Sequence, residues 1–100
     1  MIRNTLTGKQ RRFLRAMGVT LEPVVSIGKE GITPTVTDSA KEAIKKRELI
    51  KVRVLQNAPV TPDEGIRMLT ERVDADLVQI IGRNGLLFKR NFEKPRIELP

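Results

Sequence analysis

The stretch that decides the fold reads Val24-Val25-Ser26-Ile27-Gly28-Lys29-Glu30-Gly31-Ile32-Thr33-Pro34. Its first four residues are mostly apolar and β-branched, which predicts a short buried strand over 24–27. Thr33 can cap a helix, and Pro34 fits the first helical position because no backbone amide is needed there. The pair of glycines at 28 and 31 therefore connects a strand directly to a helix.

Capping patterns predict two further helices, one on each side of this stretch. Thr7-Gly8-Lys9-Gln10 has the spacing of a capping box, so we expect a helix over 8–17. Thr61-Pro62-Asp63-Glu64 combines a capping residue, a proline at the first helical position and early acids, which predicts a third helix. The expected apolar stripe of the first helix consists of Phe13, Leu14 and Met17.

Three more segments, 49–55, 77–81 and 86–90, are predicted as strands from their apolar runs and alternation. The Asn84-Gly85 pair between the last two predicts a tight turn and an antiparallel hairpin. The order is then α-β-α-β-α-β-β, which predicts an α/β fold with helices packed on a four-stranded mixed sheet. At 100 residues we expect a single domain over 1–100.

The chain is strongly basic, with 19 Lys and Arg against 12 Asp and Glu, a net charge of +7. Such an excess favours a polyanionic partner. The absence of Cys and His removes disulfides, thiolate zinc sites and the commonest general base. No apolar setting is evident that would raise the pKa of a carboxylate. We therefore expect no enzyme, no cofactor, no metal and no small-molecule substrate.

Charges interrupt every apolar run, so the sequence contains no stretch of the length that a membrane span requires. The N-terminus, Met1-Ile2-Arg3-Asn4-Thr5, lacks the apolar region of a secretory signal. We therefore expect a cytoplasmic protein without membrane attachment, and we expect it to be a monomer.

The loop Gly28–Gly31 is the candidate centre of a binding site. Its glycines would let a phosphate backbone pass close by, and the amides of the following helix would point toward an anion. KH domains use a GxxG loop in this way. The alternative is a turn that needs positive φ angles, and Glu30 weakens the binding interpretation. The second such pattern, Gly82–Gly85, lies in the predicted hairpin, where a turn explains it.

Basic residues fall into clusters with few interleaved acids, as a surface that follows phosphates requires. Aromatic residues are few, so we expect recognition of shape and phosphate rather than base stacking. The candidate RNA-binding residues are Gly28, Lys29, Glu30 and Gly31 in the loop, Lys9, Arg11, Arg12 and Arg15 in the first helix, Lys41, Lys45, Lys46 and Arg47 in the second helix, and Lys51 and Arg53 in the next strand.

Five segments together resemble the CRM domain, named for chloroplast RNA splicing and ribosome maturation, in its stand-alone bacterial YhbY-like form. They are Leu6–Arg12, Pro23–Gly31, Glu48–Val52, Leu77–Gly82 and Ile97–Pro100. The resemblance implies a fold similar to the C-terminal domain of translation initiation factor three, with a KH-like GxxG loop that contacts RNA through Gly28, Lys29 and Gly31. The chain departs from the family at Met17-Gly18-Val19, where a His is common, and at Phe88, where a Tyr is common.

For bacterial members the resemblance also implies association with precursors of the large ribosomal subunit. The leading hypothesis is therefore a non-catalytic protein that binds large-subunit ribosomal RNA and acts in assembly of that subunit. Two alternatives stay open. One is an interaction module whose basic face binds an acidic protein, and the other is a DNA-binding domain, although no helix-turn-helix pattern is apparent.

Overall fold

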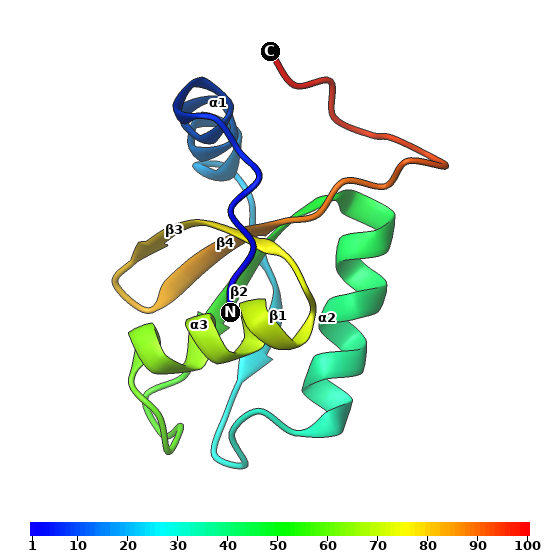
Figure 1. Ribbon diagram of the computed structural model, residues 1–100. Coiled ribbons are helices and arrows are strands. Elements are labelled where there is room, and N and C mark those ends of the chain that lie inside the picture. Colours follow the sequence, from blue (N-terminus) through cyan, green and yellow to red (C-terminus); the bar gives the residue numbers. More distant parts are fainter.

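The computed structural model describes residues 1–100 and confirms the predicted order of elements and the α/β class. Three helices pack on a four-stranded mixed sheet (Figure 1). The elements are α1 (Gly8–Gly18), β1 (Pro23–Ile27), α2 (Pro34–Arg47), β2 (Leu49–Val54), α3 (Pro62–Arg72), β3 (Asp76–Ile81) and β4 (Asn84–Phe88). None of the helices has the length and apolar character needed to cross a membrane.

The strands lie in the order β1-β2-β4-β3, with β1 parallel to β2 and both other pairs antiparallel. Because β1 and β2 run in the same direction, the loops that follow them leave the sheet at the same end. The turn between β3 and β4 also lies there, since Asn84 pairs with Arg53 near the end of β2. This end of the sheet therefore carries the Gly28–Gly31 loop.

Each face of the sheet has its own apolar core. Helices α2 and α3 cover one face, and α1 with the C-terminal segment covers the other (Figure 1). Burial of one Leu, Ile or Phe side chain contributes about 1.5–3 kcal/mol. The core under α2 and α3 includes Ile27, Ala40, Ile44, Ile50, Val52, Val54, Ile66, Leu69 and Leu87. The core under α1 consists of Leu14, Leu49, Val78, Leu86 and Phe88, against which Ile97 and Leu99 pack.

All three helix starts agree with the sequence-based predictions. The Thr7 hydroxyl accepts a hydrogen bond from the Gln10 amide at 3.1 Å, and the Thr61 hydroxyl accepts one from Glu64 at the same distance. In both cases the Gln or Glu side chain returns a bond to the capping residue, which completes the capping box. Local side-chain chemistry is therefore sufficient to place these helix starts.

The predicted apolar stripe of α1 is wrong at two of its three positions. Leu14 is fully buried, but Phe13 and Met17 are each 39% exposed. Gly18 faces the sheet instead, because a Cβ atom there would lie only 2.3 Å from Cδ1 of Leu86. The missing side chain lets the end of α1 approach β4, and this contact rotates the helix away from the orientation that its apolar residues predict.

The hairpin turn lies two residues earlier than predicted. Gly82 and Arg83 form the turn, and Gly82 has the positive φ of 57°. Asn84 and Gly85 belong to β4, which ends at Phe88 rather than at residue 90. A Cβ at Gly85 would lie 2.5 Å from Cγ2 of Ile66, so the glycine is required for packing against α3 and not for the turn.

Two buried carboxylates hold the two ends of the chain on the sheet. Asp76 accepts hydrogen bonds from the amide and the hydroxyl of Thr5, at 2.7 and 2.6 Å. Glu48, which ends α2 and is fully buried, accepts bonds from the amides of Asn91, Arg96 and Ile97. Burial alone would raise the pKa of Glu48, but these amides and the nearby Arg90 guanidinium together lower it below its ordinary value.

Candidate nucleic-acid interface

The loop Gly28–Gly31 is a tight turn between β1 and α2. The amide of Gly31 donates to the carbonyl of Gly28 at 2.9 Å, and Gly31 has a φ of 75°. Lys29 and Glu30 lie exposed at its tip, and Lys29 forms no ion pair. The positive charge of Lys29 is therefore free to meet an anion.

The two glycines of this turn differ in what the fold requires of them. Gly31 needs its positive φ, which disfavours any residue with a side chain. Gly28 has no positive φ, and a Cβ there would meet only Cδ1 of Leu55, at an ordinary distance of 3.6 Å. The requirements of a turn thus account for Gly31 but not for Gly28. A glycine at 28 instead leaves the backbone open to close approach from outside.

A basic surface continues from this loop across the sheet face that α1 leaves open. We call Arg15, Arg47, Lys51 and Arg53 the sheet-face surface. Lys51 and Arg53 project on the same side as Leu49, which packs under α1. Arg53 pairs in register with Ser26, two residues before the loop. Lys51 lines two adjoining hollows, one shared with Arg15 and the other with Arg47.

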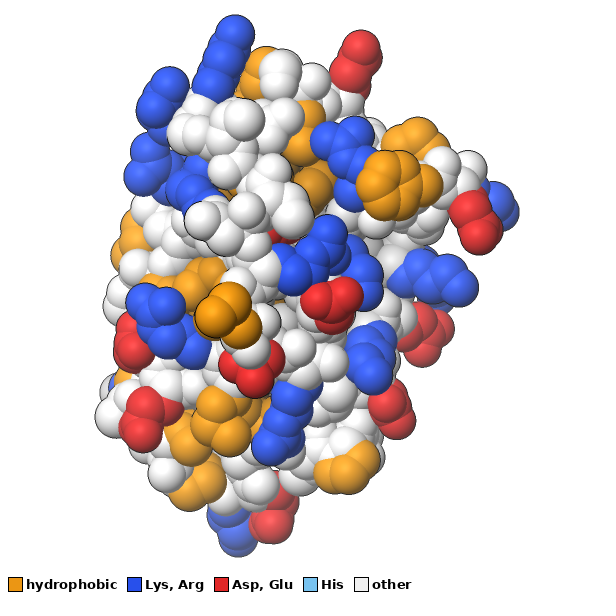
Figure 2. All heavy atoms as spheres, in the orientation of Figure 1, with side chains coloured by type: hydrophobic (Ala, Val, Ile, Leu, Met, Phe, Trp, Pro, Cys, Tyr) orange, Lys and Arg blue, Asp and Glu red, His pale blue; other side chains and the backbone are white.

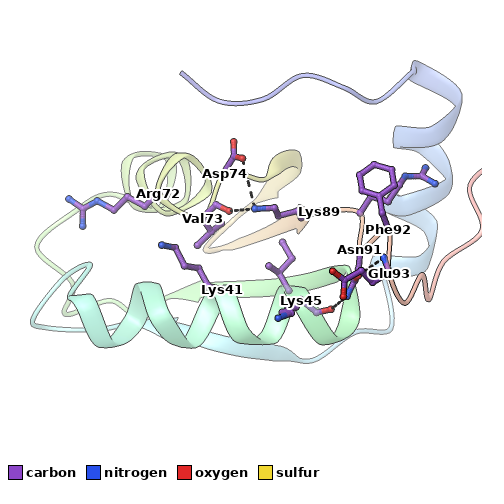
Figure 3. A pocket seen from close by; sticks show the side chains of 11 residues that line it. Lys41, Lys45, Arg72, Val73, Asp74, Lys89, Asn91, Phe92 and Glu93 are labelled. Carbon is purple, nitrogen blue, oxygen red and sulfur yellow. Dashed lines mark hydrogen bonds and ion pairs between the residues drawn. The ribbon is translucent and has the colours of Figure 1, made fainter.

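A second basic region lies on the opposite side of the sheet, between α2 and the end of α3. We call it the α2–α3 hollow; it has a volume of about 550 Å³ (Figure 3). Lys41 points from α2 toward α3, and Arg72 donates to the carbonyl of Ile32, the residue that follows the loop, at 2.9 Å. The cations of the hollow are Lys41, Lys45, Arg72, Lys89 and Arg90, and its acids are Asp74 and Glu93.

The remaining basic candidates join neither surface. Arg11 was expected on the outer face of its helix, but it is half-buried and its guanidinium donates to the carbonyls of Leu77 and Val78 in β3. Lys46 pairs with Glu42 at 3.2 Å. Lys9 and Arg12 are exposed on α1 and line none of the three hollows. Figure 2 shows basic side chains gathered over α1 and, with acids among them, in the middle of the same face.

Sequence reasoning missed Arg72, Lys89 and Arg90 as members of a basic site. Arg72 lies in a helix rich in acids, but Asp63 of that helix pairs with Arg67 at 3.0 Å and leaves Arg72 without an acidic partner. The sequence predicts Lys89 and Arg90 in the last strand, but β4 ends at Phe88, before both of them. The sequence signal that could have identified Lys89 and Arg90 is their position as a basic pair directly after the apolar strand.

Comparison with known proteins gives one family. Residues 6–89 match the CRS1/YhbY (CRM) domain. The chain is 41% identical over 95 residues to the Bacillus subtilis protein named "Probable RNA-binding protein YqeI", covering 95% of this chain and 99% of that protein. It is 34% identical over 96 residues to a Haemophilus influenzae protein named "RNA-binding protein", covering 96% of both chains.

The fold also matches a solved structure of similar size. The solution structure of the Staphylococcus aureus protein SAV1595 superposes with a TM-score of 0.79 and 38% sequence identity. The match covers 96% of this chain and 100% of the other. The same arrangement of helices on a mixed sheet thus occurs in a relative along its whole length.

Proposed function

Because the chain belongs to the CRS1/YhbY (CRM) domain family, we propose that it is a non-catalytic RNA-binding protein that holds a phosphate backbone against the Gly28–Gly31 loop. The names of the Bacillus subtilis and Haemophilus influenzae relatives support RNA as the partner. The sheet-face surface and the α2–α3 hollow supply further cations on the two sides of the sheet.

The observation that carries this proposal is Gly28. Inside the chain nothing requires a glycine there, since its φ is not positive and its surroundings would accept a Cβ. A ligand that packs on the backbone does require one, as at the GxxG loop of KH domains. Lys29 then provides a charge-assisted contact to the same phosphate group or its neighbour.

Substitution of Lys29 tests the loop directly. Lys29→Gln removes one exposed positive charge, and we expect the affinity for a ribosomal RNA fragment to fall about tenfold, which corresponds to roughly 1.4 kcal/mol. Glu30→Lys adds a positive charge beside it and should raise affinity. Filter binding at fixed salt measures both, and circular dichroism checks the fold.

A matched control separates the loop from net charge. Arg67→Gln also removes one exposed positive charge, from α3 and outside both basic surfaces. If binding depended on net charge alone, the Arg67 and Lys29 variants would weaken it equally. Equal losses would contradict a site at the loop, whereas a loss confined to the Lys29 variant supports it.

We further propose that the RNA is large-subunit ribosomal RNA and that the protein acts in assembly of the large ribosomal subunit. Family membership supports this role, and the basic surfaces suit a large structured RNA. Crosslinking in cells followed by sequencing should recover large-subunit sequences. Crosslinks dominated by other RNAs, or a main partner that is a protein retained after nuclease treatment, would contradict the role.

A further inference from the structure

Phe92 is the most exposed aromatic residue of the chain. It is 84% exposed, whereas Phe88 is buried in the core under α1 and Phe13 is partly covered. A single exposed apolar side chain is common on protein surfaces and needs no explanation by itself. What distinguishes Phe92 is how firmly its backbone is held and what surrounds its ring.

The turn that carries Phe92 is fixed at both ends. The amide of Asn91 donates to Oε2 of Glu48 at 2.7 Å, and the Asn91 side chain donates to the carbonyl of Lys45 at 2.9 Å. The Asn91 side-chain oxygen accepts bonds from the amides of Glu93 and Lys94, both at 3.1 Å. The ring therefore projects from a pre-ordered turn, which lowers the entropic cost of using it in binding.

The hollow that Phe92 helps to line is rich in cations. Phe92 lines the α2–α3 hollow at the end where α2 finishes (Figure 3). Five cations and two carboxylates line the same hollow. Lys41 and Lys45 make no ion pair, whereas Lys89 pairs with Asp74 at 3.9 Å and donates to the carbonyl of Val73 at 3.3 Å. An exposed aromatic ring on the same hollow as cations without ion pairs, Lys41 and Lys45, is a combination that can bind a base together with its phosphates.

We propose that Phe92 stacks on an unpaired base of the bound RNA while the cations of the α2–α3 hollow hold the adjoining phosphates. This inference rests on the proposed RNA-binding function and adds to it a second contact region, on the far side of the sheet from Lys51 and Arg53. The base must be unpaired because paired bases in a helix offer no free face to a side chain. The positive charge of the hollow favours RNA over an apolar protein surface.

The composition of the chain provides a direct probe, since it contains neither Trp nor Tyr. Phe92→Trp introduces one indole at the proposed stacking position. Met68→Trp, at a residue of α3 that is 42% exposed and outside the hollow, is the matched control. With a single-stranded ribosomal RNA oligonucleotide, we expect fluorescence quenching in the first variant and none in the second, although both bind.

Affinity measurements complete the test. Phe92→Leu should weaken binding about tenfold, and Phe92→Tyr should restore it, because stacking requires a ring. Equal affinity of the Leu variant and the wild type, or an unquenched indole at position 92 in a protein that binds RNA, would overturn the stacking contact and leave the proposed function standing. Failure of the wild type to bind RNA at all would overturn both.

Discussion

At the scale of single residues, Gly28 and Gly31 separate the requirements of folding from those of binding. They share a turn and a residue type, yet only Gly31 has a backbone conformation that a side chain disfavours. Gly31 is also buried, and a Cβ there would lie 3.3 Å from Cγ of Pro59. In this loop the fold requires Gly31, whereas Gly28 is available for contact with a ligand.

This difference predicts opposite results for two alanine variants. Gly31→Ala should lower the free energy of unfolding by about 1–2 kcal/mol, the cost of a positive φ for a residue with a side chain. Gly28→Ala should leave that free energy within about 0.5 kcal/mol of the wild type and should weaken RNA binding. Urea denaturation and filter binding measure the two quantities. Normal RNA affinity of the Gly28 variant would show that the exposed backbone at 28 is not a contact.

At the scale of elements, the end of α2 organises the C-terminal segment. Glu48 has a φ of 65° where α2 gives way to β2, and its side chain turns inward to bind three amides of the segment 91–97. The turn with Phe92 and the packing of Ile97 under α1 both depend on this one carboxylate. A buried charge that accepts its hydrogen bonds from backbone amides alone is destabilising once those partners are lost.

The lowered pKa of Glu48 predicts a pH dependence of stability. Its contribution should be fully present above the ordinary pKa of 4.5 and should be lost as the pH falls through the lower value of the folded state. Glu48→Gln should cost about 1.5–3 kcal/mol at neutral pH and flatten the stability profile at acid pH. Urea midpoints between about pH 3 and pH 7 measure this. Glu93→Gln, at an exposed carboxylate, is the control and should keep the acid-side slope.

The same elements show which features of the fold can be predicted from the sequence. Helix starts are local, since Thr7, Thr33 and Thr61 cap with residues three positions away, so the sequence predicts them correctly. The rotation of α1 depends on the close approach of Gly18 to Leu86. The position of the hairpin turn depends on the close approach of Gly85 to Ile66. These contacts join residues far apart in the chain, and no local pattern shows them.

For the candidate site too, local motifs could be predicted from the sequence, whereas contacts between distant segments could not. The Gly28–Gly31 loop is a continuous motif, and the sequence identifies it. The α2–α3 hollow brings Lys41 together with Arg72 and Lys89 from three separate segments, so only the fold assembles it. Arg11 looks like any other surface cation in the sequence, because its carbonyl partners belong to a strand more than sixty residues away.

At the scale of the whole molecule, the excess of positive charge includes one group of cations on each face of the sheet, the sheet-face surface and the α2–α3 hollow. Release of counterions from each contacted phosphate makes binding depend on salt, with a logarithmic slope of roughly −0.7 to −0.9 per contact. Each face should therefore contribute its own share to the slope.

A pair of double variants tests this division. Lys51→Gln with Arg53→Gln, and separately Lys41→Gln with Lys45→Gln, should each make the slope shallower by roughly 1.4–1.8 if both cations contact phosphate. The two reductions should add, since the pairs lie on opposite faces of the sheet and share no partner. Titrations at several salt concentrations measure the slopes. An unchanged slope for one pair would exclude that face from the interface.

The contact between Arg11 and β3 has a consequence for solubility. β3 is the outermost strand on its side of the sheet, and a register shift between Leu77 and Gln79 interrupts its pairing with β4. The backbone of Arg3 forms an isolated parallel β-bridge with Asp76, and the Arg11 guanidinium donates to the carbonyls of Leu77 and Val78. These backbone groups are therefore not free to pair with a strand of another molecule. Arg11→Met should uncover it, and light scattering should then detect aggregation that increases with concentration. Arg11, which the sequence places among the nucleic-acid contacts, would thus protect the edge strand from pairing with other molecules.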